Sequence, residues 1–296
     1  MAEVALDLAR KGAALLKERG FAQGRLEAEL LLAGVLGLER LQLYLQFARP
    51  VSEAELERYR GFMRRRLKHE PLQYILGEAV FRQLRLRVDG RVLIPRPETE
   101  VLVGQVLDWA AARRGPLCAL DLGTGSGAIA LSLLEEGDFG RVVGTDVSPA
   151  ALEVAEANAR ARGAGDRLEL RAGTLWEPIR PGERFDVVVS NPPYVALAEA
   201  ALLPPEVSCW EPAGALYGGE DGLAVVRQIV AGAAARLVPG GLLALEIGAS
   251  QGEAVVAMVE ARGGAWGVPR LIKDLAGRDR VVLAESGMEG EHGGAR

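Results

Sequence analysis

Short apolar runs alternate with helix-like segments over the last two thirds of the chain, and this alternation constrains the fold more than any other feature. The apolar runs lie at 118–122, 141–146, 168–172, 185–190 and 242–247. Helical patterns separate several of them, notably at 127–135, 149–162 and 222–236. Strands that are apolar along their whole length are typical of parallel sheets with helices on both faces. The pattern therefore predicts an α/β fold with a mostly parallel sheet.

The chain closes on two further strand-like stretches, 266–271 and 280–283. The link between them is too short for a helical crossover. Parallel neighbours need such a crossover, so we expect this last pair of strands to be antiparallel.

The first third of the chain is predicted to be helical and to precede a short hairpin. Ser52 and Glu55 have the spacing of a capping box, so a helix should begin there and end before Pro71. Residues 84–88 alternate between apolar residues and arginine, as in a half-buried strand. Together these patterns predict four parts, which are a helical domain at 1–72, a β-hairpin connector at 73–95, an α/β domain at 96–285 and a disordered tail at 286–296.

Residue counts exclude several classes of site. The 296 residues include only two histidines and two cysteines. These cannot form a multi-histidine metal site, a cysteine-rich zinc site or a disulfide framework, so no metal is expected. Glu3 and Asp7 stand where a signal peptide would be basic and then apolar, and no apolar run reaches the length of a membrane span. We expect a soluble cytoplasmic protein.

A glycine-rich loop follows the first apolar run directly. It reads Asp121-Leu122-Gly123-Thr124-Gly125-Ser126-Gly127. Glycines let the backbone turn sharply and let a ligand approach closely. The spacing differs from a Walker loop, which ends in Gly-Lys-Ser/Thr, and from the dinucleotide fingerprint Gly-x-Gly-x-x-Gly. Asp146 ends the next run, where an acid can accept hydrogen bonds from both hydroxyls of a ribose. The two features predict a nucleoside-containing cofactor.

The fourth apolar run ends in Asn191-Pro192-Pro193-Tyr194. Ligands of open α/β sheets bind at the carboxyl ends of strands. Asn191 offers a carbonyl acceptor, the prolines stiffen the loop and expose carbonyls without a competing N–H, and Tyr194 offers a flat apolar face. Such a site can accept both hydrogens of a planar NH₂ group and aim its nitrogen at an electrophile. Acceptors return electron density to the delocalised nitrogen, so no histidine base is needed.

With these motifs the chain resembles the class I S-adenosylmethionine-dependent methyltransferases that act on planar nitrogen, and within them the release-factor glutamine methyltransferase family (PrmC/HemK). The resemblance covers nearly the whole chain. It extends to residues 93–100, to Glu211-Pro212 and to Glu246-Ile247-Gly248. It implies a Rossmann-like fold with a mostly parallel sheet and an antiparallel C-terminal strand. It also implies a small helical N-terminal domain that helps to recognise the release factor, and a linking β-hairpin.

The resemblance further implies methyl transfer from S-adenosylmethionine, leaving S-adenosylhomocysteine, to the side-chain amide nitrogen (N5) of the glutamine in the Gly-Gly-Gln motif of peptide chain release factors. The cofactor-binding residues that it implies are Gly123, Thr124, Gly125, Ser126, Gly127, Asp146, Thr174, Leu175 and Asn191. The target amide is held by Asn191, Pro192, Pro193 and Tyr194, of which Asn191 and Tyr194 are the catalytic pair. Many relatives have an acid in place of Thr174 that reads the adenine amino group. A neutral hydroxyl accepts a weaker hydrogen bond, so adenine recognition here should depend more on backbone and packing.

Three other functions fit part of the sequence. A DNA adenine-N6 methyltransferase also uses Asn-Pro-Pro-Tyr, but the net charge of −5 and the lack of an obvious base-recognition insert oppose it. A ribosomal-protein glutamine methyltransferase shares the fold and chemistry, although residues 94–100 look more like the release-factor enzymes. A non-catalytic nucleoside-binding module would leave residues 191–194 without a purpose. We therefore expect release factors as partners, and neither DNA nor a membrane.

Overall fold

The computed structural model describes residues 3–287, and its contacts divide the chain into two compact units. Within the described residues, the first unit comprises 3–78 together with Pro204–Trp210, and the second unit comprises 79–203 and 211–287. The predicted disordered tail, 286–296, lies outside the described residues from position 288 onward. The predicted domain limits at 72, 95 and 285 stay predictions. In the described part of the chain, no helix has both the length and the apolar character needed to cross a membrane.

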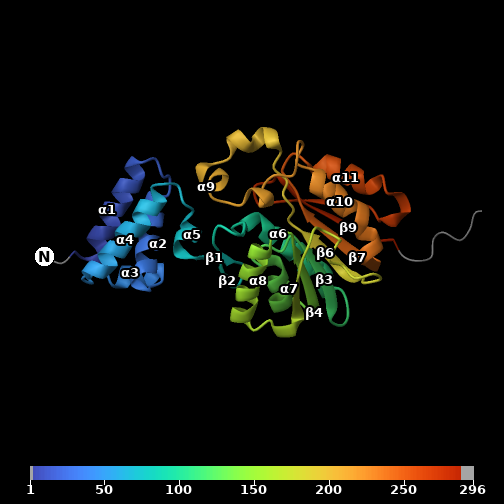
Figure 1. Ribbon diagram of the computed structural model, residues 1–296, viewed down its shortest axis with the longest axis horizontal. Helices are drawn as coiled ribbons and strands as arrows, with labels where there is room; N and C mark the ends of the chain where they lie inside the picture. Colours follow the sequence, from blue (N-terminus) through green and yellow to red (C-terminus); the bar gives the residue numbers. More distant parts are fainter. Residues whose placement is uncertain (1–2, 288–296) are drawn as a thin grey trace, which may run out of the picture. The chain divides into compact units, whose positions relative to one another are not determined.

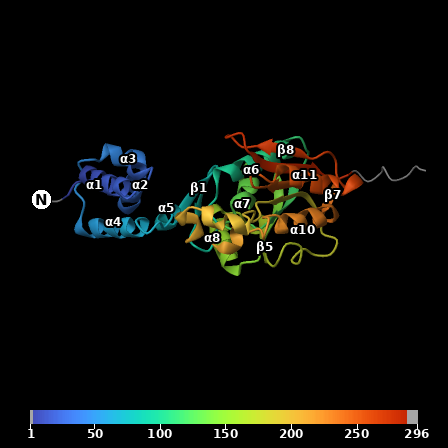
Figure 2. The ribbon, with the colours of Figure 1, turned by 90° about the horizontal axis from the view of Figure 1, so that it is seen from above.

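The first unit is helical (Figures 1 and 2). Its helices are α1 (Ala5–Glu18), α2 (Gly24–Leu36), α3 (Arg40–Leu45), α4 (Glu53–Arg66), α5 (Leu72–Leu76) and α9 (Pro205–Ser208). The predicted capping box begins α4, because Ser52 Oγ accepts from Glu55 N at 3.3 Å and Glu55 Oε2 accepts from Ser52 N at 2.9 Å. Buried apolar residues of α1, α2, α3, α4 and α5 form the core of this unit.

The second unit contains a seven-stranded sheet in the order β5-β4-β3-β6-β7-β9-β8. Its strands are β3 (Leu117–Leu122), β4 (Phe139–Asp146), β5 (Leu168–Ala172), β6 (Phe185–Ser190), β7 (Leu237–Glu246), β8 (Arg270–Lys273) and β9 (Asp279–Glu285). Neighbours from β5 to β7 are parallel, and β9 is antiparallel to both β7 and β8. The mostly parallel sheet and its antiparallel end are therefore confirmed.

Helices cover both faces of this sheet (Figure 1). They are α6 (Pro97–Ala111), α7 (Ala128–Glu136) and α8 (Pro149–Arg162) on one face, and α10 (Ala224–Ala233) and α11 (Gly252–Glu260) on the other. Successive strand residues enter opposite cores, as Ala119 and Leu120 do, which explains why the strands are apolar along their whole length. Short 3-10 turns lie at Gly165–Arg167, Leu197–Leu202, Ala213–Ala215, Ala234–Arg236 and Gly263–Ala265.

A two-stranded sheet, β1 (Glu78–Phe81) and β2 (Leu84–Arg87), stands where the hairpin is predicted. Phe81, Leu84 and Leu86 are buried in the same core as α6 and α7. The turn between the strands places Arg82 at a φ of 51°. Its guanidinium is fixed by Glu136 of α7, at 2.7 Å from both carboxylate oxygens.

The strand order reverses between β3 and β6, because β4 and β5 lie on one side of β3 while β6 and β7 lie on the other. Open α/β sheets bind ligands outside the carboxyl ends of the strands at such a switch point. Leu122 of β3 pairs with Thr145 of β4 and Ser190 of β6, so the three strands end level with one another. The predicted site residues lie at the ends of these strands, in the loops that follow them and in the loop after β5.

Candidate active site

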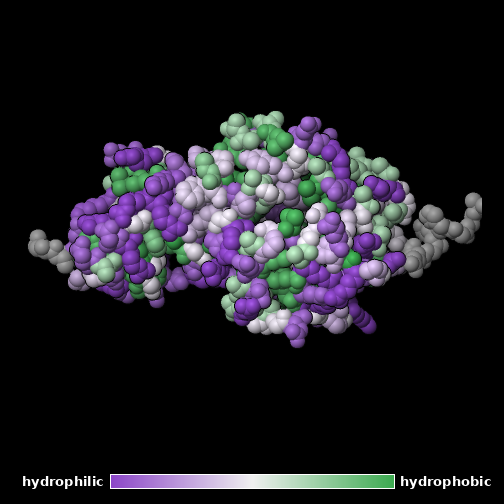
Figure 3. All heavy atoms as spheres, viewed as in Figure 1, coloured by the Kyte–Doolittle hydropathy of each residue, from purple (hydrophilic) through white to green (hydrophobic). Residues whose placement is uncertain are grey.

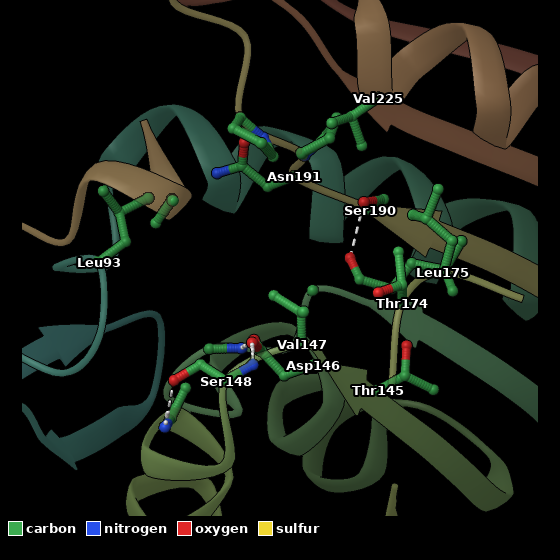
Figure 4. A pocket seen from close by; sticks show the side chains of 18 of the residues that line it. Leu93, Thr145, Asp146, Val147, Ser148, Thr174, Leu175, Ser190, Asn191 and Val225 are labelled. Carbon is green, nitrogen blue, oxygen red and sulfur yellow. Dashed lines mark hydrogen bonds between the residues drawn. The ribbon is translucent and has the colours of Figure 1, made fainter. Parts of the chain in front are cut away.

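A cavity of about 300 Å³ opens at the carboxyl ends of β3, β4 and β6 (Figure 4). The predicted site residues that line it are Gly123, Gly125, Asp146, Thr174, Leu175, Asn191, Pro192 and Pro193. Four other predicted residues, Thr124, Ser126, Gly127 and Tyr194, lie outside this lining. Further wall residues were not predicted from the sequence, among them Arg91, Leu93, Ser148, Val225 and Gln228. The cavity thus brings the two predicted motifs together and adds walls from β4, α10 and the segment before α6.

Positive φ angles at Gly123, Gly125 and Gly127 give the glycine loop its shape, with values of 75°, 55° and 81°. Residues with a side chain rarely adopt this conformation. The turn directs the backbone N–H groups of Gly123 and Thr124 to the same acceptor, Thr145 O, each at 2.8 Å. A Cβ built on Gly123 would meet no atom within 4 Å, so the loop faces open space. Gly127 ends the loop as the N-cap of α7.

Asp121, the acid ahead of this loop, is fully buried under it. Its Oδ2 accepts from Thr124 Oγ1 at 2.7 Å and from Ala130 N at 3.2 Å, while Oδ1 has no hydrogen-bond partner among the described residues. Burial raises the pKa of Asp121 to about 7, against the hydrogen bonds from Thr124 and Ala130. Asp121 and Thr124 therefore support the loop on its buried side. Thr124 was predicted to bind the cofactor, and in the structure its hydroxyl donates to Asp121.

Asp146 lies at the end of β4 with its carboxylate at the cavity wall (Figure 4). Its Oδ2 accepts from Gly125 N at 2.9 Å and its Oδ1 accepts from Ser148 N at 2.9 Å. These two bonds fix the orientation of the carboxylate, and each oxygen keeps a lone pair for a further donor. Ser148 caps α8 by accepting from Ala151 N at 3.2 Å. The Asp146 carboxylate is therefore fixed at the cavity wall and can still accept hydrogen bonds from a ligand.

Thr174 and Leu175 line the cavity on the loop after β5. Leu175 has a φ of 46°, an unusual conformation for a residue with a side chain. The Thr174 backbone N–H donates to Glu177 Oε2 at 3.0 Å. Figure 4 shows Leu175 on the same side of the cavity as Thr174. Together with Val225 of α10, Leu175 provides an apolar wall suited to a flat ring.

Asn191 follows β6 and is connected to two buried polar residues. Its Nδ2 donates to Thr99 Oγ1 at 3.0 Å, and Thr99 Oγ1 donates to Glu246 Oε2 at 2.6 Å. Thr99 belongs to the first turn of α6 and Glu246 is the last residue of β7. Both are buried, and burial raises the pKa of Glu246 to about 7. The sequence reading did not assign a role to Thr99 or Glu246, because no spacing rule joins positions so far apart.

Tyr194 is partly buried and lies outside the cavity lining. Its hydroxyl is 3.4 Å from Glu246 Oε1, and burial raises the pKa of its phenol above the usual value, so the phenol stays protonated at neutral pH. Its backbone carbonyl accepts from Gln251 Nε2 at 3.0 Å. A Cβ on Gly222 would stand 2.2 Å from that carbonyl oxygen, so the loop at 191–194 requires a glycine beside it.

An ion pair joins the motifs at 93–100 and 211–212. Arg96 Nη2 donates to Glu211 Oε1 at 2.5 Å. Glu211 is buried, which raises the pKa of its carboxyl, while the charge of Arg96 opposes this rise. Pro212 follows at once and lines the cavity. This ion pair joins two segments 115 residues apart at the cavity wall.

Comparisons with known proteins show which families this chain resembles. The family described as "PrmC N-terminal domain" matches residues 7–77, and the family described as "Methyltransferase domain" matches residues 119–203. A release factor glutamine methyltransferase of Geobacter sulfurreducens is 46% identical over 84% of this chain and 85% of its own length. One of Cereibacter sphaeroides is 43% identical over 95% of this chain and 98% of its own length.

A solved structure has a similar fold over part of this chain. It is the T. thermophilus 16S rRNA N2 G1207 methyltransferase in complex with AdoMet and guanosine, with a TM-score of 0.51 and 21% identity. The match covers 71% of this chain and 49% of that one. At this identity the likeness establishes the methyltransferase fold and nothing further.

Proposed function

This chain belongs to the release factor glutamine methyltransferases, and from that premise we propose that it transfers a methyl group from S-adenosylmethionine to the side-chain amide nitrogen (N5) of the glutamine in the Gly-Gly-Gln motif of peptide chain release factors. The observation that carries the proposal is a single cavity with Asp146 on one wall and Asn191, fixed by Thr99, on the other. A release factor acts in translation, so we place the enzyme in the cytoplasm.

The cavity has the properties that S-adenosylmethionine requires. Asp146 offers a carboxylate to the two ribose hydroxyls, and the open side of Gly123 leaves room for the methionine part. Leu175 and Val225 offer an apolar wall for adenine. When bound, the cofactor supplies an electrophilic methyl group on a positively charged sulfur. We assign no residue of this chain to a metal ion.

The residues of the loop at 191–194 act on the target amide. An amide nitrogen is a poor nucleophile because its lone pair is delocalised. Asn191 Oδ1 and an exposed proline carbonyl can accept its two hydrogens, which orients the nitrogen and returns electron density to it. Positioning of this kind contributes roughly 7–11 kcal/mol to a reaction barrier. We give Tyr194 no role as a base, because its phenol stays protonated, and we assign it to packing at the end of the loop.

The helical unit is the part that we propose to contact the release factor outside the glutamine. On α3, Leu41 and Leu45 are 74% and 81% exposed, and their spacing places them on one helix face. Figure 3 shows hydrophilic residues over much of the helical unit on the face that it presents, so exposed leucines are exceptions. We expect the pair Leu41→Asp and Leu45→Asp to raise the KM for release factor about 100-fold or more, since each buried leucine is worth roughly 1.5–3 kcal/mol and every 1.4 kcal/mol is a factor of about ten. Leu275→Asp, at a fully exposed leucine of the other unit, is the matched control.

Tritiated S-adenosylmethionine tests the reaction itself when it is offered with release factor, ribosomal protein and DNA in parallel. We expect label on release factor alone, and loss of that label when the glutamine of Gly-Gly-Gln is replaced by alanine. Label on ribosomal protein or DNA would favour the other two substrate classes. Label that persists on the alanine variant would contradict glutamine as the target.

A further inference from the structure

We propose that Thr99 and Glu246 are positioning residues that keep the Asn191 side chain turned so that its carbonyl oxygen, and not its NH₂ group, faces the substrate amide. The inference rests on the proposed function, because it concerns how the same site holds its glutamine. It assigns a task to two buried residues that the cofactor does not need.

The three side chains form one hydrogen-bonded series. Asn191 Nδ2 lies 3.0 Å from Thr99 Oγ1, and Thr99 Oγ1 lies 2.6 Å from Glu246 Oε2. Thr99 is 4% exposed and Glu246 is fully buried, so water does not compete for these bonds. Asn191 is partly exposed at the cavity wall (Figure 4). The series therefore runs from the buried end of β7 to the cavity.

The direction of each bond follows from the donors available. Above its pKa of about 7, the Glu246 carboxylate is ionised and can only accept, so the single hydroxyl hydrogen of Thr99 points to Glu246. The Thr99 oxygen is then left as an acceptor, and only the NH₂ end of the Asn191 amide can satisfy it. The Asn191 carbonyl oxygen is thereby turned away from Thr99.

This orientation matters because the two ends of an asparagine amide have opposite hydrogen-bonding roles. The substrate presents an NH₂ group, which needs acceptors. If the Asn191 amide turned over, two NH₂ groups would face each other and no hydrogen bond would form. Asparagine alone has little preference between its two orientations, so the choice must come from its neighbours. Thr99 supplies the choice, and Glu246 makes Thr99 an acceptor.

Substitutions at Thr99 test the proposal at about pH 8.5, above the pKa of Glu246. Thr99→Val keeps the shape and removes the hydroxyl, while Thr99→Ser keeps the hydroxyl. We expect Thr99→Val to lower kcat about 10- to 100-fold, somewhat less than deletion of a preorganised polar contact. Thr99→Ser should restore most of this loss. The Kd for S-adenosylmethionine should stay within about twofold in both, because Thr99 acts on the substrate side.

Ser132→Ala is the control for loss of a buried hydroxyl. Ser132 is fully buried in α7, and its Oγ has no hydrogen-bond partner among residues 3–287. Its replacement should leave kcat unchanged. If Ser132→Ala lowered kcat as much as Thr99→Val, a general packing effect would explain both results and the proposal would be wrong.

A double-mutant cycle distinguishes an effect of Thr99 on the orientation of Asn191 from a general effect of Thr99 on the stability of the protein. If Thr99 acts through Asn191, then adding Thr99→Val to Asn191→Ala should cause no further loss of kcat. A further loss equal to that of Thr99→Val in the wild type would overturn the proposal. A wild-type enzyme that fails to methylate release factor would refute the proposed function. A wild-type enzyme that methylates normally, beside a Thr99→Val enzyme of equal rate, would refute this inference alone.

Discussion

The two walls of the cavity are built in different ways. On the cofactor side, the loop at 123–127 and Asp146 are held by backbone groups, since Thr145 O accepts two N–H bonds and the Asp146 carboxylate accepts two more. On the amide side, Asn191 is held by the side chains of Thr99 and Glu246. Backbone contacts tolerate many side-chain replacements, whereas a series of side chains depends on every member. We therefore expect substitutions on the cofactor side to lower mainly the affinity for S-adenosylmethionine. Substitutions on the amide side should lower mainly the rate of methyl transfer.

Replacement of Asn191 is the strongest way to test this difference. Asn191→Ala removes the oriented acceptor, and we expect turnover to fall roughly 10²- to 10³-fold, as when one preorganised polar contact is deleted from a site. The affinity for S-adenosylmethionine should change much less. Single-turnover methyl transfer from enzyme loaded with cofactor measures the rate, and calorimetry measures the affinity. A parallel loss of both would show that the two walls do not act separately.

Replacement of Asp146 should have the opposite signature. Asp146→Ala removes a charged acceptor for two ribose hydroxyls, which costs about 1.5–3 kcal/mol of cofactor binding. Turnover at saturating cofactor should stay close to that of the wild type. Calorimetry measures the affinity, and Asp166→Ala, at an exposed acid of the same unit, is the control. Unchanged affinity in Asp146→Ala would mean that the end of β4 does not hold the ribose.

The same difference explains how much the sequence could predict. The glycine loop is contiguous in the chain and Asp146 ends the next strand, so their spacing was enough to predict that they lie together, and both line the cavity. Helix α8 was predicted at 149–162 and found there, because Ser148 and Pro149 fix its start. The support of Asn191 was not predicted, since Thr99 and Glu246 are 92 and 55 positions away and only the folded sheet brings them together.

Two local features, a helix and the start of a strand, were also not predicted correctly from the sequence. Helix α11 was not predicted. It begins at Gly252, which packs so closely against Asp279 that a Cβ there would stand 2.5 Å from Asp279 Oδ2. The last strands were predicted at 266–271 and 280–283, but β8 begins only at Arg270, because residues 263–265 form a 3-10 turn and Trp266 makes a single bridge to Ser286. Both differences arise from tertiary contacts that leave no periodic pattern.

The buried acid beneath the glycine loop makes stability depend on pH. Burial raises the pKa of Asp121 to about 7 in the folded state, above its value of about 3.8 when unfolded. The folded state then holds a proton that the unfolded state releases. Its contribution to stability is therefore complete below about pH 4 and is lost as the pH rises toward 7. Between pH 5 and pH 8 we expect a loss of about 1–3 kcal/mol.

Asp121→Asn isolates this effect, because the amide cannot ionise. Denaturant unfolding at pH 5 and pH 8 should show that the wild type loses more stability than the variant as the pH rises. Glu246, whose pKa is also raised, remains in both proteins and cancels from the comparison. If the wild type and Asp121→Asn changed equally between the two pH values, Asp121 would not be the group that binds the proton.

The smallest effect is expected at the Tyr194 hydroxyl. Its contact with Glu246 Oε1 is 3.4 Å long, near the limit for a hydrogen bond, and its raised pKa keeps the phenol protonated and unable to act as a base. Tyr194→Phe should therefore lower turnover by less than about threefold, whereas Tyr194→Ala removes the ring and should cost about tenfold or more. Single-turnover rates of the two variants give the comparison, with Tyr59→Phe in the helical core as the control for loss of a buried hydroxyl. A Tyr194→Phe enzyme as slow as Asn191→Ala would indicate that the phenol takes part in proton transfer. The reaction would then require the Tyr194 hydroxyl as well as the oriented Asn191.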